Sequence, residues 1–108
     1  MIGIISGTNR PNSNSLKLSN YYKKKLDEKS QDSILLSLED LPVDFIKAEM
    51  YGKTNPSFEP FQQIINSMDK FIFIIPEYNG SFPGILKTVV DACAFPSSFM
   101  HKKVALVG

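Results

Sequence analysis

Residues 70–84, "KFIFIIPEYNGSFPG", decide the fold, because a continuous apolar run passes here into a loop rich in proline and glycine. The run at 70–76 is short and rich in Ile and Phe, which is typical of a strand buried on both faces of a sheet. From Ile85 to about Phe95 the apolar side chains recur at helical spacing. The segment therefore predicts a central strand, a rigid turn and a helix in succession.

The same succession occurs elsewhere in the chain. Apolar runs that predict strands lie at 1–6 ("MIGIIS"), 33–38 ("SILLSL") and 102–108 ("KKVALVG"). Helices are expected from about 13 to 29 and at 61–68, the first with its buried stripe on Leu18, Tyr21, Tyr22, Lys25 and Leu26. Alternating strands and helices indicate an α/β protein with a parallel sheet and right-handed crossovers.

One long connection interrupts this alternation. Residues 39–60 contain three prolines and show no clear period. We interpret the segment as a loop that covers the core, with five apolar side chains that need burial: Val43, Phe45, Ile46, Tyr51 and Phe58.

Composition excludes several classes of function. The 108 residues provide one domain's worth of core, and the 12 basic and 11 acidic residues leave a net charge of +1, so no nucleic-acid partner is implied. No apolar run approaches the ~20 residues that span a bilayer, so no membrane partner is expected. The single Cys93 rules out an internal disulfide, and with His101 as the only other soft ligand it disfavours a metal site. The first residues lack signal-peptide features, so we expect a cytoplasmic protein.

Two unusual loops follow strands, at 7–15 ("GTNRPNSNS") and 76–84 ("PEYNGSFPG"). In a parallel sheet both lie at the edge where ligands bind. The first loop offers hydroxyls at Thr8, Ser13 and Ser15, a guanidinium at Arg10, and the N-terminus of a helix, which together suit a phosphate. An ordinary helix cap explains the same residues equally well at this stage.

The absence of two known phosphate-binding motifs indicates which kind of phosphate the first loop would bind. Neither G-x-x-x-x-G-K-S/T nor G-x-G-x-x-G occurs, so a monophosphate ester is a better expectation than a nucleoside triphosphate or a pyrophosphate. In the second loop, Pro76 and Pro83 stiffen the chain, and an aromatic and an amide side chain suit a flat heterocycle. The alternative is a rigid turn in which Tyr78 is merely packed.

These two stretches, extended to "PEYNGSFPGILKTVVDA" at 76–92, resemble the NAD(P)H-dependent FMN reductase family of flavodoxin-like proteins. That family is marked by G-S/T-x-R-x-x-S after the first strand and P-E-Y-N-x-S-x-P-G-x-L-K-x-x-x-D after the third. The resemblance extends over residues 1–108 and implies a doubly wound parallel sheet. It also implies an FMN cofactor, NADPH or NADH as hydride donor, a small-molecule electron acceptor, and a homodimer or homotetramer.

The resemblance implies roles for ten residues. Those around the FMN phosphate are Thr8, Arg10, Ser13 and Ser15, and Asn9 and Asn14 of the same loop are also implied to bind the cofactor. Those that border the isoalloxazine ring, largely through backbone groups and one amide, are Pro76, Glu77, Tyr78 and Asn79. No catalytic side chain is implied, since the flavin N5 carries the chemistry. Among the other residues, we interpret His101 as a loop residue and Cys93 as core packing, and Lys87 with Asp91, which belong to the second motif, as a helix-surface pair.

The chain departs from the family pattern at its end. A flavodoxin-like sheet has strand order 2-1-3-4-5, but only four candidate strands are present, so we expect one incomplete domain that stops after the fourth strand. Three functions remain open: an FMN-dependent reductase or a fragment of one, an electron-transfer flavodoxin-like protein that uses no nicotinamide, and a non-enzymatic remnant that oligomerises. For the first, the acceptor is free flavin, a quinone, an azo dye or a metal oxyanion.

Overall fold

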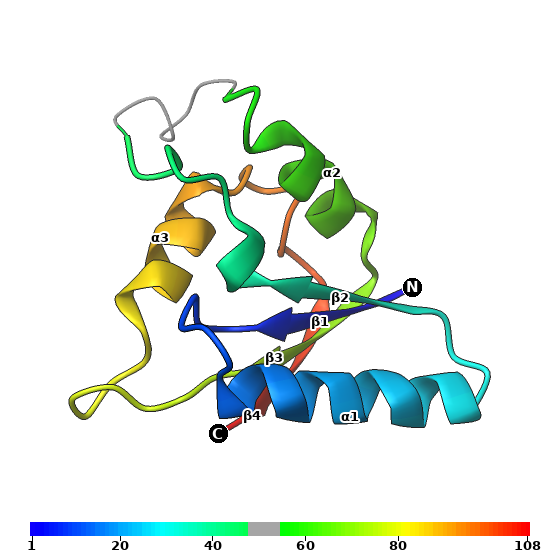
Figure 1. Ribbon diagram of the computed structural model, residues 1–108. Coiled ribbons are helices and arrows are strands. Elements are labelled where there is room, and N and C mark those ends of the chain that lie inside the picture. Colours follow the sequence, from blue (N-terminus) through cyan, green and yellow to red (C-terminus); the bar gives the residue numbers. More distant parts are fainter. Residues whose placement is uncertain (48–54) are drawn as a thin grey trace.

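A computed structural model describes residues 1–47 and 55–108 (Figure 1). The strands are β1 (Ile2–Ser6), β2 (Ser33–Ser37), β3 (Lys70–Ile74) and β4 (Lys103–Val107). The helices are α1 (Asn14–Glu28), the single 3-10 turn η1 (Leu38–Asp40), α2 (Glu59–Ser67) and α3 (Gly84–Ala92). Each strand and α-helix expected from the sequence is present, with ends that differ by a few residues.

All four strands are parallel and form one sheet in the order β2-β1-β3-β4. Ile72 of β3 pairs with Ile4 of β1 on one side and with Ala105 of β4 on the other, so the expectation that β3 is central is confirmed. The order reproduces the first four positions of the 2-1-3-4-5 flavodoxin-like sheet. The predicted fold class is therefore confirmed.

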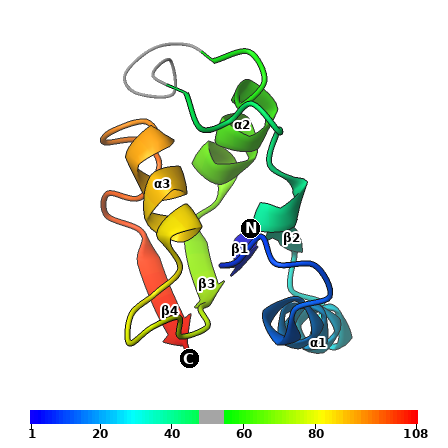
Figure 2. The same ribbon diagram turned by 60° about the vertical axis from the view of Figure 1, so that its left-hand side comes forward.

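Helices cover both faces of the sheet. Figure 1 shows α1 below the strands and α2 and α3 above them, and Figure 2 shows α2 and α3 together on the side away from α1. The larger apolar core lies on the α2 and α3 side, where alternate residues of the strands meet the two helices. Its buried members include Ile5, Leu36, Ile65, Met68, Phe71, Phe73, Leu86 and Val89.

The buried stripe of α1 differs from the predicted one. Leu18 and Tyr21 are 36% and 55% exposed, whereas Ser15 and Ser19 are buried. Small side chains let the helix backbone approach the sheet closely, and the Ser19 hydroxyl donates to the Ser15 carbonyl at 2.7 Å, so its burial leaves no unpaired group. The prediction was wrong for Leu18, Tyr21 and Lys25, which are exposed, because it counted only large side chains; Tyr22 and Leu26 are half-buried.

The connection between η1 and α2 buries fewer residues than predicted. Phe45 and Phe58 are buried, with ring centroids 5.0 Å apart. Val43 and Ile46 are exposed, so for them the prediction was wrong. The Phe45 amide donates to the carbonyl of Pro42 in a tight turn, which directs a single side chain inward. Tyr51 lies outside the described residues.

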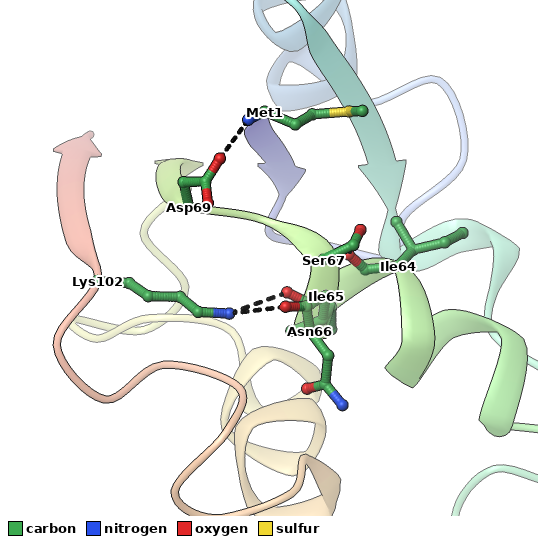
Figure 3. A network of polar contacts seen from close by, with 7 residues as sticks. All are labelled: Met1, Ile64, Ile65, Asn66, Ser67, Asp69 and Lys102. Atoms are coloured by element: carbon green, nitrogen blue, oxygen red, sulfur yellow. Dashed lines mark hydrogen bonds and ion pairs between the residues drawn. The ribbon is translucent and has the colours of Figure 1, made fainter.

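Polar contacts hold the edge of the sheet where the strands begin (Figure 3). The amino group of Met1 forms an ion pair with the Asp69 carboxylate, and this hydrogen bond and charge lower the pKa of Asp69. The Lys102 ammonium donates to the carbonyls of Ile65 at 3.4 Å and Asn66 at 3.2 Å, at the C-terminal end of α2, where a cation is favoured by the helix dipole. The two motif loops, 7–15 and 76–84, lie at the opposite edge of the sheet, where the strands end.

Candidate cofactor site

The two motif loops meet at the carboxyl edge of the sheet. The chain leaves β1 toward β2 and leaves β3 toward β4, so this edge holds the switch point in strand order at which ligands bind. A cavity of about 350 Å³ lies between the loops. It is lined by Arg10, Pro11, Asn12, Ser13, Asn14, Ser15, Pro76 and Tyr78. The fold thus brings residues from both motifs to one hollow.

The first loop presents hydrogen-bond donors to this cavity. Ser13 is the N-cap of α1, and its side-chain oxygen accepts from the Leu16 amide at 3.0 Å. The amides of Asn14 and Ser15 lie in the first turn of the helix, where N–H groups have no carbonyl acceptor within the helix. No described residue accepts a hydrogen bond from either amide. Arg10 is exposed and forms no ion pair within the described part of the chain. Free amides, hydroxyls and one cation suit an anion.

Backbone pairing fastens this loop to the neighbouring strand. The Gly7 amide donates to the Ile74 carbonyl at 2.9 Å, which continues the ladder between β1 and β3 by one residue. A side chain at position 7 would place its Cβ only 2.9 Å from that carbonyl oxygen, so glycine is required for the approach. On the other side of β3, the Ile75 amide donates to the Val107 carbonyl at 2.8 Å.

Thr8 joins the two loops to each other. Its side chain is 1% exposed, and its Oγ1 lies 2.7 Å from the phenolic oxygen of Tyr78. The same oxygen accepts from the Arg10 amide at 3.2 Å. Thr8 does not line the cavity; it lies behind the wall that Arg10 and Tyr78 present to it.

The second loop contains a two-residue hairpin. The amides and carbonyls of Tyr78 and Ser81 pair with each other at 2.8 and 3.2 Å, and between them Asn79 and Gly80 have φ of +53° and +81°. This is the conformation of a type I′ turn, for which Asn-Gly is strongly preferred. The Glu77 carboxylate accepts a hydrogen bond from the Gly80 amide. Both Glu77 and Asn79 therefore shape the turn.

A second hollow of about 300 Å³ continues beyond Pro76, which lines both. Its walls come from the end of β3, the hairpin and the end of β4: Ile75, Pro76, Glu77, Ser81, Phe82, Leu106, Val107 and Gly108. Most of these side chains are apolar, in contrast to the polar cavity. The site as a whole has a polar, cationic end and an apolar end.

The structure divides the predicted site residues into two groups. Six of them line the polar cavity: Arg10, Ser13, Asn14, Ser15, Pro76 and Tyr78. Thr8, Asn9, Glu77 and Asn79 do not, although Glu77 lines the apolar hollow. Two lining residues, Pro11 and Asn12, were missed. Asn12 has φ of +53°, and an asparagine between a proline and a helix cap is the available signal for such a left-handed turn.

The titratable residues that were not assigned to the cofactor site pack against the core, pair on a helix surface or lie in a turn. Cys93 packs against the core, as predicted, and burial raises its pKa from 9.0 to about 12, partly offset by a hydrogen bond with Ser98. Lys87 and Asp91 form the predicted ion pair on α3, and His101 lies in a turn with φ of +63°.

Within residues 1–47 and 55–108, no helix has the length and apolar character needed to cross a bilayer. The same residues contain no group of three side chains that could ligate a metal ion.

Known proteins are similar to this chain in sequence and in fold. The chain is 28% identical over 109 residues to an FMN-dependent NADPH-azoreductase of Staphylococcus saprophyticus, covering 97% of this chain and 57% of that protein. It is 35% identical over 66 residues to an NAD(P)H:quinone oxidoreductase of Solanum tuberosum, covering 59% of this chain and 34% of that protein. The chain thus spans little more than half the length of the first of these relatives, and a third of the other.

A solved structure of a flavoenzyme is also similar to this chain. The flavoenzyme NAD(P)H:(acceptor) oxidoreductase of Paracoccus denitrificans superposes with a TM-score of 0.76 at 28% identity, covering 99% of this chain and 59% of that one. A family-wide sequence model described as NADPH-dependent FMN reductase matches residues 1–108. Because this match extends over all of the sequence and the two motif loops meet at one site, the chain belongs to the NADPH-dependent FMN reductase family.

Proposed function

We propose that the chain binds FMN across the two hollows and takes part in the NAD(P)H-dependent reduction of a small-molecule electron acceptor. One observation carries this proposal: a polar, cationic cavity and an apolar hollow share Pro76 at the switch point of the sheet. FMN has matching ends, a phosphate monoester and a flat, largely apolar ring system.

The proposed phosphate contacts come from the first loop. Arg10 supplies a charge-assisted hydrogen bond, the amides of Asn14 and Ser15 supply donors at the positive end of α1, and the Ser13 and Ser15 hydroxyls add further donors. Thr8 acts on the conformation of this loop through its contacts with Arg10 and Tyr78. The arrangement requires no lysine, because a monoester has no second phosphate to bridge.

The proposed ring contacts come from the second loop. Pro76 separates the polar and apolar hollows, and Glu77 and Asn79 hold the hairpin in its left-handed turn. When bound, FMN would supply the redox chemistry at its N5, between NADPH or NADH as hydride donor and the small-molecule acceptor. The protein binds, orients and partly desolvates the cofactor, so no nucleophile or general base is needed.

The wider setting follows from the same features. Relatives named for azo and quinone substrates support a conjugated small-molecule acceptor. The free thiol of Cys93 fits a reducing compartment, and the proposed location is the cytoplasm. Exposed apolar residues on β4, Val104 and Leu106, support self-association of this 108-residue chain as a homodimer or homotetramer.

The proposal is tested by the visible spectrum of the purified chain with added FMN, before and after NADPH or NADH. Saturable binding followed by bleaching of the flavin absorbance supports an FMN-dependent reductase. Binding without bleaching by either nicotinamide identifies an electron-transfer protein instead, and absence of FMN binding leaves the non-enzymatic alternative. Comparing the two nicotinamides at equal concentration also gives the preferred hydride donor.

A further inference from the structure

The hydrogen bond between Thr8 and Tyr78 has a direction that the surrounding contacts determine. Within the described residues, Thr8 Oγ1 has two partners: the Arg10 amide at 3.2 Å and the Tyr78 phenolic oxygen at 2.7 Å. An amide N–H can only donate, so it cannot accept the hydroxyl proton of Thr8. Because Thr8 is 1% exposed, a proton directed anywhere else would be buried without an acceptor. Thr8 therefore donates to Tyr78.

This direction leaves the phenolic proton of Tyr78 uncommitted. Tyr78 is half-buried and lines the polar cavity beside Arg10 and Ser15. Thr8 is the one described residue within hydrogen-bond distance of its hydroxyl, and Thr8 already donates in that bond. The phenol thus has one lone pair engaged on the protein side and one proton free to meet a ligand.

The phenolic proton of Tyr78 can be donated to a ligand in the polar cavity. Tyr78 does not line the apolar hollow, whose aromatic wall is Phe82. A charged phosphate oxygen is a stronger acceptor than any atom of a neutral ring, and hydrogen bonds to it are roughly twice as strong as neutral ones. The position of Tyr78 in the cavity therefore favours the phosphate over the ring.

We infer that Tyr78 selects ligands bearing a phosphate monoester by donating its hydroxyl proton to the phosphate, and that Thr8 is a positioning residue that holds the phenol from behind. The inference rests on the proposed function, since FMN is the ligand whose phosphate the cavity would hold. It differs from the role implied by family resemblance, which places Tyr78 against the isoalloxazine ring.

The test compares FMN with riboflavin, which has the same ring but no phosphate. Affinities for both are measured by quenching of flavin fluorescence in the unaltered chain, Tyr78→Phe, Thr8→Val and the double variant. Tyr78→Phe keeps the aromatic ring and removes only the hydroxyl. It should weaken FMN binding about ten- to a hundredfold and leave riboflavin within about twofold. Thr8→Val should preserve most of the preference for FMN, because the phenol remains.

The double variant protects the test against misfolding. Tyr78→Phe alone leaves the proton of the buried Thr8 hydroxyl without an acceptor. The double variant removes that proton, and the donor that loses its acceptor is the amide of the exposed Arg10, which water can reach. Thermal unfolding of each variant shows whether it is folded. The double variant should lose the preference for FMN to the same extent as Tyr78→Phe.

Three results would overturn the inference while leaving the proposed function intact. Equal weakening of FMN and riboflavin in Tyr78→Phe would show a ring contact or a purely structural role. Loss of the preference in Thr8→Val as large as in Tyr78→Phe would show that fastening the loops matters and donation does not. Unchanged FMN affinity in Tyr78→Phe would show no role. If the unaltered chain binds no FMN, the proposed function itself fails.

Discussion

Thr8 Oγ1 and Tyr78 Oη lie 2.7 Å apart, although seventy residues separate them in the chain. This contact joins the loop that follows β1 to the loop that follows β3, on the inner side of the polar cavity. Neither loop alone forms the cavity, since its walls come from residues 10–15 on one side and from Pro76 and Tyr78 on the other. The site is therefore a property of the sheet order, which makes these two loops neighbours.

The first prediction concerns Arg10, the only charged residue among the described residues that line the polar cavity. Arg10→Ala should remove a charge-assisted hydrogen bond of about 1.5–3 kcal/mol and weaken FMN binding roughly ten- to a hundredfold. Fluorescence titration measures the change. Lys17→Ala is the matched control, because it removes a positive charge from the start of α1 without touching the cavity. Equal losses in the two variants would show that only general charge attraction is involved.

The second prediction separates the conformation of Asn79 from its amide. Asn79 has φ of +53°, and Asn79→Ala should cost roughly 1–2 kcal/mol of folding stability because alanine resists this region. Asn79→Gly adopts the turn freely and should retain FMN binding if the residue acts only through the hairpin. Urea unfolding and FMN titration of both variants check this. Weak binding by a stable Asn79→Gly variant would instead assign the amide a direct contact.

The third prediction concerns the close approach at Gly7. Gly7→Ala should place Cβ against the Ile74 carbonyl oxygen, displace the first loop and cost about 1–3 kcal/mol of stability. Gly84→Ala, with no atom near the added methyl, should be neutral or stabilising by up to about 1 kcal/mol. Denaturant midpoints of the two variants measure the difference, and similar midpoints would contradict the proposed steric role of position 7.

The fourth prediction concerns pH. Burial raises the pKa of Cys93 to about 12 in the folded chain, so the unfolded chain loses its thiol proton first as pH rises. Folding stability from this group is present in full below pH 9 and falls between pH 9 and 12. The slope of the urea midpoint between pH 8 and 10 should therefore be shallower in Cys93→Ala than in the unaltered chain. A disulfide reagent at pH 8 should label Cys93 only after unfolding.

The fifth prediction concerns association. Leu106 is 73% exposed on β4, which is the last strand of the sheet as described, and next to it Val104 and Phe82 border an apolar groove of about 280 Å³. Light scattering at micromolar concentration should give a mass above 12.1 kDa. Leu106→Lys should lower that mass, and Lys103→Glu on the same strand is the control for charge alone. A monomer in the unaltered chain would contradict the proposal.

Much of the fold could be predicted because strands of a parallel sheet are short, continuous apolar runs. The segments at 1–6 and 70–76 are so apolar that only a position at the centre of the sheet buries them. The face of α1 could not be predicted in the same way. Ser15 and Ser19 are buried because they are small, and hydrophobic periodicity assigns no burial to serine.

The site could be predicted to the level of its loops but not of its side chains. Chain order and motif spacing bring 7–15 and 76–84 to one edge, and six of the ten predicted residues line the cavity found there. The assignment of Thr8 to the inner side of the wall depends on where the Tyr78 ring lies after folding. The role of Glu77 as acceptor for the Gly80 amide likewise depends on the hairpin geometry.

The backbone hydrogen bonds from Gly7 to Ile74 and from Ile75 to Val107 fix the distance between the two parts of the site. They extend the sheet ladder beyond the ends of the strands, so the backbones that line the polar and apolar hollows keep the spacing of neighbouring strands, about 4.8 Å. Side chains can adjust at either end, but the interval itself cannot stretch without breaking the ladder. The site is therefore expected to select ligands by the length of the linker between their anionic and aromatic groups, as well as by the chemistry of those groups.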